Sequence, residues 1–215
     1  MELQRVANAG ILLKMDGISV LLDGLCQKLW PYMETPEPIF QDLLRNPPDA
    51  LCFTHWHADH FSEPLAAAFC EKNSRPIFGP ERLPYATNFS SGMIGGVRIT
   101  PVVSRHLGKM EKGLSHVSYV LQGTKCVWFM GDAAPIQWRS REDLPRPDVV
   151  IAPFAYGTTE TAWKLTASLA DQVVLVHMPR EEEDPHGLWP LVRQVTGKIP
   201  GPPVVIPQMG QKIGI

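Results

Sequence analysis

The sequence is poor in several features that define whole classes of protein. It has no apolar run near the roughly 18 residues that cross a bilayer, and its first residues lack the basic start and apolar core of a secretion signal. Its four cysteines are scattered and form no C-x-x-C pair, so we expect free thiols rather than a disulfide framework or a thiolate metal site. These absences predict a cytoplasmic protein with no membrane segment.

The chain also lacks a strong excess of charge. Its 20 Lys and Arg residues nearly balance 22 Asp and Glu residues, for a formal net charge of −2. We therefore do not expect a broad basic face that binds nucleic acid. The sequence contains no G-x-S-x-G motif either, which excludes one common serine nucleophile. The balance of charge does not exclude a small, locally charged substrate site, and a homo-oligomer stays open.

No repeat, linker or low-complexity tract divides the 215 residues, so we expect a single domain over 1–215. Short apolar runs alternate with turns and a few helical segments, which favours packed layers of strands and helices. The expected strands are LQRVANAGILLKM, ISVLLDG, ALCFT, RPIFG, VRITPVVSRH, HVSYVLQG, KCVWFMGD, DVVIAPFAYG and QVVLVHMP. The expected helices cover 39–45, 63–72 (capped by Ser62), 159–169 and 186–196, and 80–95 is expected to be a loop.

A dense group of histidine and aspartate side chains follows the expected strand ALCFT. His55 and His57 are two residues apart, so their rings share one face of extended backbone. Asp59 and His60 come after the chain has left the strand. Imidazole and carboxylate without thiolate suit zinc, manganese or iron, and four such groups would be costly to desolvate together without a cation. The pattern H-x-H-x-D-H therefore predicts a metal site.

Further candidate ligands stand near the ends of later strands. Asp132 ends KCVWFMGD, His177 follows QVVLV, and His106 ends VRITPVVSRH. His116 begins the next strand and is the alternative to His106. We favour His106, because delivery from a strand end matches the other candidates. The plainer alternatives are a turn aspartate for Asp132 and a buried core histidine for His177.

Two polar residues near the first hairpin have open roles. Asn8 either lines the site from below or serves a turn. Asp23, in LLDG, either contacts a ligating histidine or is an ordinary turn aspartate, and we favour the turn.

These motifs together resemble the metallo-β-lactamase-fold hydrolase superfamily over nearly the whole chain, and most of all its compact, lactonase-like members. NAGILLKMDGISVLLDG looks like the first hairpin of that family, THWHADH like its signature loop, FMGDA like the segment with its bridging aspartate, and VLVHMP like its last strand-end histidine. The resemblance implies an α+β fold with four αββα layers, in which two mixed β-sheets are sandwiched between helices. It also implies two divalent metal ions, Zn²⁺ in first place, with Mn²⁺ or Fe²⁺ as alternatives.

The resemblance further implies how the metals are held and what they do. The implied ligands are His55, His57 and His106 for the first metal, Asp59, His60 and His177 for the second, and Asp132 as a bridge, with Asp59 and Asp132 also serving catalysis. The implied activity is hydrolysis of an ester, lactone or related bond of a small substrate by a hydroxide that both metals activate.

Three other functions compete with that one. The same fold and metals could serve a phosphodiesterase or nuclease, or a protein that binds metal without catalysis. A two-iron oxidoreductase is disfavoured, because the iron-type pattern places a glutamate where this chain has His57.

Four residues are candidates for contacts to the substrate. The phenol of Tyr156 could hydrogen-bond a developing oxyanion, and His116 could contact the substrate if it is not a ligand. Trp30, with its neighbours in the connection 24–48, could form an apolar wall, and Lys109 would suit a phosphate or carboxylate. The plainer alternatives are packing for Tyr156, His116 and Trp30 and a solvated loop for Lys109. We therefore expect a small substrate, with an anionic one as a first guess.

Overall fold

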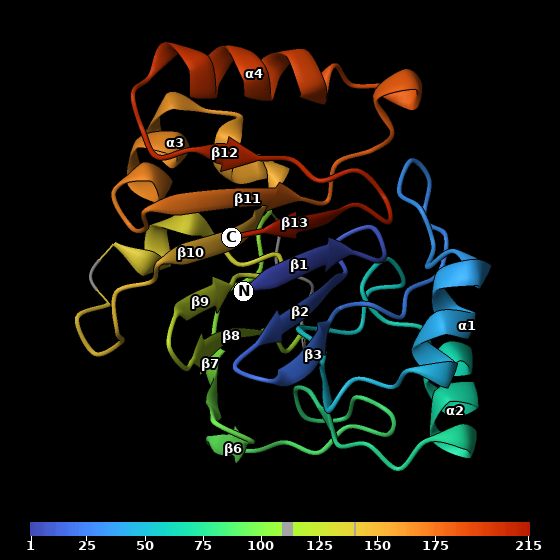
Figure 1. The fold of residues 1–215 in the computed structure, drawn as a ribbon. Helices are drawn as coiled ribbons and strands as arrows, with labels where there is room; N and C mark the ends of the chain where they lie inside the picture. The colour runs from blue at the N-terminus through green and yellow to red at the C-terminus, as the bar shows by residue number, and fades with distance from the viewer. Residues whose placement is uncertain (109–113, 140) are drawn as a thin grey trace.

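Two β-sheets pack face to face in the computed structural model, which describes residues 1–108, 114–139 and 141–215 (Figure 1). The first sheet contains β1 (Glu2–Arg5), β2 (Ile11–Met15), β3 (Ile18–Leu22), β4 (Ala50–Cys52), β5 (Ile77–Phe78) and β13 (Lys212–Gly214). The second contains β6 (Gly92–Ile94), β7 (Val97–Val103), β8 (Val117–Gln122), β9 (Cys126–Phe129), β10 (Val149–Pro153), β11 (Gln172–Val176) and β12 (Val204–Val205). Their strand orders are β13-β1-β2-β3-β4-β5 and β12-β11-β10-β9-β8-β7-β6. Both sheets mix parallel and antiparallel pairs.

Helices cover the outer face of each sheet. On the first sheet, α1 (Glu37–Arg45) and α2 (Glu63–Lys72) bury side chains such as Phe40 and Phe69 against strand residues such as Leu51. On the second sheet, α3 (Glu160–Ala167) and α4 (Leu188–Lys198) do the same. Short 3-10 turns η1 (Pro135–Trp138), η2 (Phe154–Gly157) and η3 (Glu181–Glu183) complete the regular structure of the described residues. The predicted four-layer αββα arrangement is confirmed.

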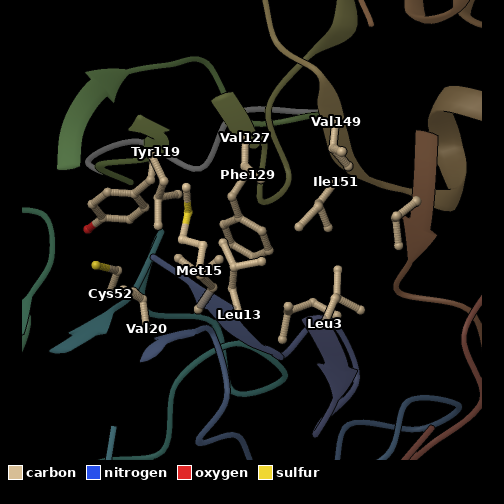
Figure 2. Packing of buried hydrophobic residues seen from close by; sticks show 14 of the residues in the cluster. Leu3, Leu13, Met15, Val20, Cys52, Tyr119, Val127, Phe129, Val149 and Ile151 are labelled. Atoms are coloured by element: carbon tan, nitrogen blue, oxygen red, sulfur yellow. The ribbon is translucent and has the colours of Figure 1, made fainter. Parts of the chain in front are cut away.

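The central core lies between the two sheets. Figure 2 shows Leu3 and Leu13 of the first sheet pointing toward Phe129 and Ile151 of the second, and all four are fully buried. Burying one such side chain stabilises the fold by about 1.5–3 kcal/mol. The Tyr119 hydroxyl crosses from the second sheet to donate to the backbone of the first, so the one polar atom on its ring is also paired.

The strand directions bring several loops to one edge of the sandwich. In the second sheet β7, β9, β10 and β11 run in the same direction, so the loops that follow them emerge at one edge. The backbone N–H of Val117 donates to Thr54 O at 2.9 Å, which ties this edge to the loop after β4. Gly131 has a φ of +54°, and a Cβ there would lie 2.6 Å from Thr54 Cγ2. Glycine is therefore required where the two loops meet.

The structure corrects several expected boundaries. The first run is two strands, because residues 6–10 turn between β1 and β2, whereas the turn at Asp16 and Gly17, both with positive φ, joins β2 and β3 as predicted. Residues 92–94 form β6 rather than loop. The last helix begins at Leu188 rather than at residue 186. The Asp184 carboxylate accepts the N–H of Trp189 in its first turn and so caps the helix there. The four cysteines are free, as expected.

The closing segment belongs to both sheets. Its first part forms β12 beside β11 of the second sheet, and its second part forms β13 beside β1 of the first. In the described parts of the chain, every helix is too short or too polar to cross a lipid bilayer.

We predict that Ser62→Ala destabilises the fold by about 1 kcal/mol, because the Ser62 hydroxyl accepts the N–H of Leu65 and caps α2. Urea denaturation measures the change in the free energy of unfolding. The control is Ser90→Ala at an exposed loop serine, which should leave the free energy unchanged. Equal stability of the two variants would mean that the cap contributes nothing.

Candidate metal centre

The histidines and aspartates predicted from sequence converge at this edge of the sandwich. Their ligand atoms form three groups whose members all lie within 4.8 Å of one another: His55, His57 and His106; His55, His60 and Asp132; and Asp59, His60 and His177. The loops after β4, β7, β9 and β11 supply them, so the arrangement follows from the strand directions. We call His55, His57 and His106 the first group and Asp59, His60 and His177 the second.

A chain of hydrogen bonds orients the His55 ring. The Thr54 hydroxyl donates to Asp23 Oδ2 at 2.6 Å, so it can only accept from His55 Nδ1, which lies 2.9 Å away. Burial lowers the pKa of His55 well below its usual value, so the ring is neutral. Its proton is therefore on Nδ1, and Nε2 turns its lone pair toward His57 Nδ1, 2.9 Å away. That is the form in which imidazole binds a metal.

The His60 and His106 rings are held in the same way. His60 Nδ1 donates to Asp23 Oδ2 at 2.8 Å, and His106 Nδ1 donates to Leu107 O at 2.6 Å. In both rings Nε2 is left facing Asp132. The contact of Asp23 with His60 corrects the expectation of a plain turn aspartate. The sequence signal for this contact is the position of Asp23 directly after β3, which pairs with β4.

His116 lies beside the cluster with both ring nitrogens already bonded. Its Nε2 accepts the backbone N–H of Asp132 at 3.0 Å, and its Nδ1 lies 2.7 Å from the Ser104 hydroxyl. Burial lowers the pKa of His116 to about 3, so the ring is neutral at physiological pH. Because the Nε2 lone pair is used, His116 positions Asp132, and the geometry favours His106 as the third histidine.

Asp132 stands between the two groups. Its Oδ2 lies 3.4 Å from His60 Nε2 and 3.6 Å from the Nε2 atoms of His106 and His177. Burial opposes its charge, but His177 and His60 outweigh that effect and hold its pKa well below the usual range, so it is a carboxylate. Two ligands of one tetrahedral zinc ion stand roughly 3.3 Å apart. These separations therefore suit a carboxylate shared by two cations.

The second group is completed by the loop after β11. His177 Nε2 lies 3.0 Å from Asp59 Oδ2. The His177 backbone has a φ of +62° and donates its N–H to Asn8 O, while Asn8 Nδ2 donates to Asp59 Oδ2 at 3.4 Å. Asn8 therefore contacts the backbone of one residue of the second group and the carboxylate of another, which favours its role as a residue lining the site.

The described residues contain seven buried side-chain nitrogen or oxygen atoms without a hydrogen-bond partner, and six of them lie at this site. They are Asn8 Oδ1, His60 Nε2, His106 Nε2, Asp132 Oδ1, His177 Nδ1 and His177 Nε2. A buried polar atom without a partner costs about 1–3 kcal/mol, so such a concentration needs a partner from outside the chain. Imidazole nitrogen and carboxylate oxygen fit divalent Zn, Mn or Fe.

Arg5 connects the backbone beside the second group to the closing segment of the chain. No motif in the sequence marks Arg5 as a residue of the site. Its buried guanidinium donates to the backbone oxygens of Ala7, Asn8, Pro207 and Met178, the last at 2.7 Å. Burial lowers its pKa to about 10, so it remains a cation. A signal was present: Arg5 is two residues from buried Leu3 on the same face of β1.

Tyr32 also lies at the cluster. Its ring meets the His177 ring edge-on, with centroids 4.2 Å apart. Burial, followed by the charges of Asp132 and Asp59, raises the pKa of Tyr32 to about 12. From the sequence, Tyr32 is only one residue of the connection 24–48, which could form an apolar wall. No local pattern predicts where so long a connection packs against the rest of the protein.

The other predicted substrate residues fall in different places. Tyr156 is fully buried, and its hydroxyl donates to Ala133 O at 2.8 Å and accepts from Trp138 Nε1. Its only proton is used, which supports the packing alternative over contact with an oxyanion. Trp30 is 71% exposed, with its ring edge near His186. Lys109 lies outside the described residues.

Comparison with known proteins identifies the architecture. No family model and no curated protein matches the sequence. A possible metal-dependent hydrolase from Veillonella parvula is 17% identical, with a TM-score of 0.72 over 100% of this chain and 99% of that one. The metallo-β-lactamase-fold protein YhfI from Bacillus subtilis is 14% identical, with a TM-score of 0.65 over 99% and 98%. The chain therefore has the metallo-β-lactamase fold, as the sequence predicts.

A third similar structure limits what the fold alone implies. CmlA, a diiron β-hydroxylase from Streptomyces venezuelae, is 13% identical, with a TM-score of 0.65 over 100% of this chain and 54% of that one. The same fold is thus found in a possible hydrolase and in a diiron hydroxylase, so the reaction must be argued from the site.

We predict that His106→Ala reduces the metal bound per chain, whereas His116→Gln leaves it near the wild-type value. His106 Nε2 has no hydrogen-bond partner among the described residues, whereas His116 Nε2 accepts the backbone N–H of Asp132. Elemental analysis after dialysis against a competing chelator measures the difference. Loss of metal from His116→Gln alone would reverse the assignment.

We predict that Arg5→Lys weakens metal binding by the second group more than by the first. A lysine keeps the charge but donates in fewer directions, so the carbonyls flanking Asn8 and His177 lose their common partner. Chelator competition, which gives the two affinities separately, measures the ratio between them. The control is Arg98→Lys at an exposed arginine, which should leave both metal affinities unchanged. An equal loss of affinity at both groups would mean that Arg5 only stabilises the fold in general.

Proposed function

We propose that the chain is a metal-dependent hydrolase that cleaves an ester, lactone or related bond of a small organic molecule. One observation carries the proposal: the two histidine and aspartate groups meet at Asp132, and six buried nitrogen and oxygen atoms at this site, among them Nε2 of His60, His106 and His177, have no hydrogen-bond partner among the described residues. Divalent cations bound there would lower the pKa of a coordinated water from 15.7 toward about 7 and polarise a substrate oxygen, so hydrolysis would need no protein nucleophile.

Each residue of the centre has a role in this proposal. The first group would hold one cation, the second group would hold the other, and Asp132 would bind both. Asp23 and Thr54 keep the protons of His55 and His60 on Nδ1, away from the cations. His116 fixes the backbone from which the Asp132 carboxylate projects. Zinc is the first choice for this donor set, with manganese or iron as alternatives.

A pocket beside the metal-binding loop supports an organic substrate. It has a volume of about 490 Å³ and is lined on one side by Trp56 and Ala58, which alternate with the metal-binding residues. Phe61 and Leu83 also line it. Such a size and mixed lining are typical of small-molecule sites. Glu63, Glu81 and Arg82 also line it, so its charges do not favour an anion, and we propose that it takes an uncharged part of the substrate.

We predict that chelation abolishes hydrolysis of 4-nitrophenyl acetate and that added Zn²⁺ or Mn²⁺ restores it. Asp132→Asn should lower the rate by about 10²-fold or more, because both cations lose a charged ligand. The assay is absorbance of the released nitrophenolate, with bis(4-nitrophenyl) phosphate and a simple lactone as parallel substrates.

The parallel substrates separate the competing functions. Faster turnover of the phosphate diester would favour a phosphodiesterase over the esterase or lactonase. A loaded protein that hydrolyses none of the three would favour metal binding without catalysis, and iron found with an oxidase activity would favour the diiron alternative. Full turnover by a verified metal-free protein would contradict the proposal outright.

A further inference from the structure

The ring of Tyr32 packs against His177 of the second group, and its hydroxyl has no hydrogen-bond partner among the described residues. The phenol is half-buried, its ring packs edge-on against His177, and Asp59 and Asp132 are near enough to act on its charge. Among the described residues, none is a hydrogen-bond partner of this hydroxyl. An ordinary phenol keeps its proton at neutral pH. Tyr32 therefore brings an uncommitted O–H donor to the site.

The backbone around Tyr32 holds it in place. The N–H of Tyr32 donates to Leu29 O at 2.6 Å, and the N–H of Leu29 donates back to Tyr32 O at 3.3 Å, which closes a short turn. The base of this loop is fixed by Thr35, whose hydroxyl accepts from Cys26 N and donates to Gly24 O, both at 2.9 Å. The ring is thus positioned before any ligand arrives, which is what a useful hydrogen-bond donor requires.

Most other side-chain donors of the centre are already used. The Nδ1 protons of His55, His60 and His106 are bonded to Thr54, Asp23 and Leu107, and the Asn8 amide donates to Asp59. The carboxylates Asp59 and Asp132 can only accept. A substrate oxygen that gains negative charge would therefore find few side-chain donors among the described residues here, and Tyr32, which is only partly buried, is one that is not already used.

We propose that Tyr32 is a catalytic residue that donates a hydrogen bond to the substrate oxygen on which negative charge develops. The proposal rests on the proposed hydrolytic function and deepens it, since it concerns the same site. The substrate oxygen is that of a carbonyl or phosphoryl group. Tyr32 keeps its proton throughout; it forms no covalent bond and takes no metal. This is the role that the sequence analysis offered to Tyr156, whose proton the structure commits to Ala133.

The test compares Tyr32→Phe with the wild type and with Tyr85→Phe, a matched change at an exposed tyrosine. The hydroxyl of Tyr32 has no protein partner, so its removal should leave the melting temperature and the metal content unchanged. In the assay with 4-nitrophenyl acetate, Tyr32→Phe should lower kcat by about 10²-fold with a small change in KM, because one oxyanion donor is lost. Tyr85→Phe should match the wild type.

A second measurement does not depend on turnover. The protein is loaded with Co²⁺ and titrated with inorganic phosphate, while the visible absorption of the cobalt is followed. Loss of a hydrogen bond to a charged ligand should raise the phosphate Kd by about 10-fold or more in Tyr32→Phe and leave it unchanged in Tyr85→Phe.

The two measurements separate the two proposals. A wild type that binds phosphate through Tyr32 but hydrolyses nothing would contradict the hydrolase while supporting Tyr32 as the anion donor. Phosphate affinity equal in Tyr32→Phe and the wild type, or no phosphate binding by the wild type, overturns the role of Tyr32. Loss of metal from Tyr32→Phe also overturns it, because the phenol would then be a ligand.

Discussion

The arrangement depends on one electrostatic constraint: several imidazole nitrogens and a carboxylate oxygen are withdrawn from water at a single edge of the sandwich, without a hydrogen-bond partner among the described residues. Burial of these groups costs little free energy only if each ring donates its proton to the protein through one nitrogen and its other nitrogen can bind a cation. Thr54 and Asp23 impose the tautomers of His55 and His60, and a backbone carbonyl imposes that of His106. The strand ends, the glycine at 131 and the buried His116 are all arranged around this requirement.

Much of the fold, and the convergence of the histidine and aspartate side chains at one edge, could be predicted from the sequence, because both have local signals. Apolar runs that end in polar residues mark strand ends, and Ser62 followed by Glu63 and Pro64 marks a helix start that the structure reproduces to the residue. The sequence does not decide which of His106 and His116 completes the first group, because each adjoins a strand. What distinguishes them is the N–H of Asp132, which is distant in sequence and reaches only His116.

The residues that sequence reasoning missed or misplaced act through tertiary contacts. Tyr156 and Tyr32 are both aromatic residues beside loops, and only the fold shows that the hydroxyl of Tyr156 donates to a backbone carbonyl while the ring of Tyr32 packs against His177 of the cluster. The local sequence favours a turn role for Asp23, because its contact with His60 links segments that follow two different strands. The side-chain pattern places Arg5 on the buried face of β1, but it does not show the backbone oxygens to which Arg5 donates, because these are distant in sequence.

The bonds of Arg5 to residues far along the chain also bear on the order in which the protein is made. A ribosome delivers the chain from its N-terminus, so His55, His57 and His106 emerge long before Met178 and Pro207, on which Arg5 depends. Until then the free side of β1 also lacks its neighbour β13. Nascent chains would thus carry the first group before the second group is complete. A premature stop shortly before residue 207 would remove the bond of Arg5 to Pro207 and the strand β13, while its bonds to Ala7, Asn8 and Met178 could still form.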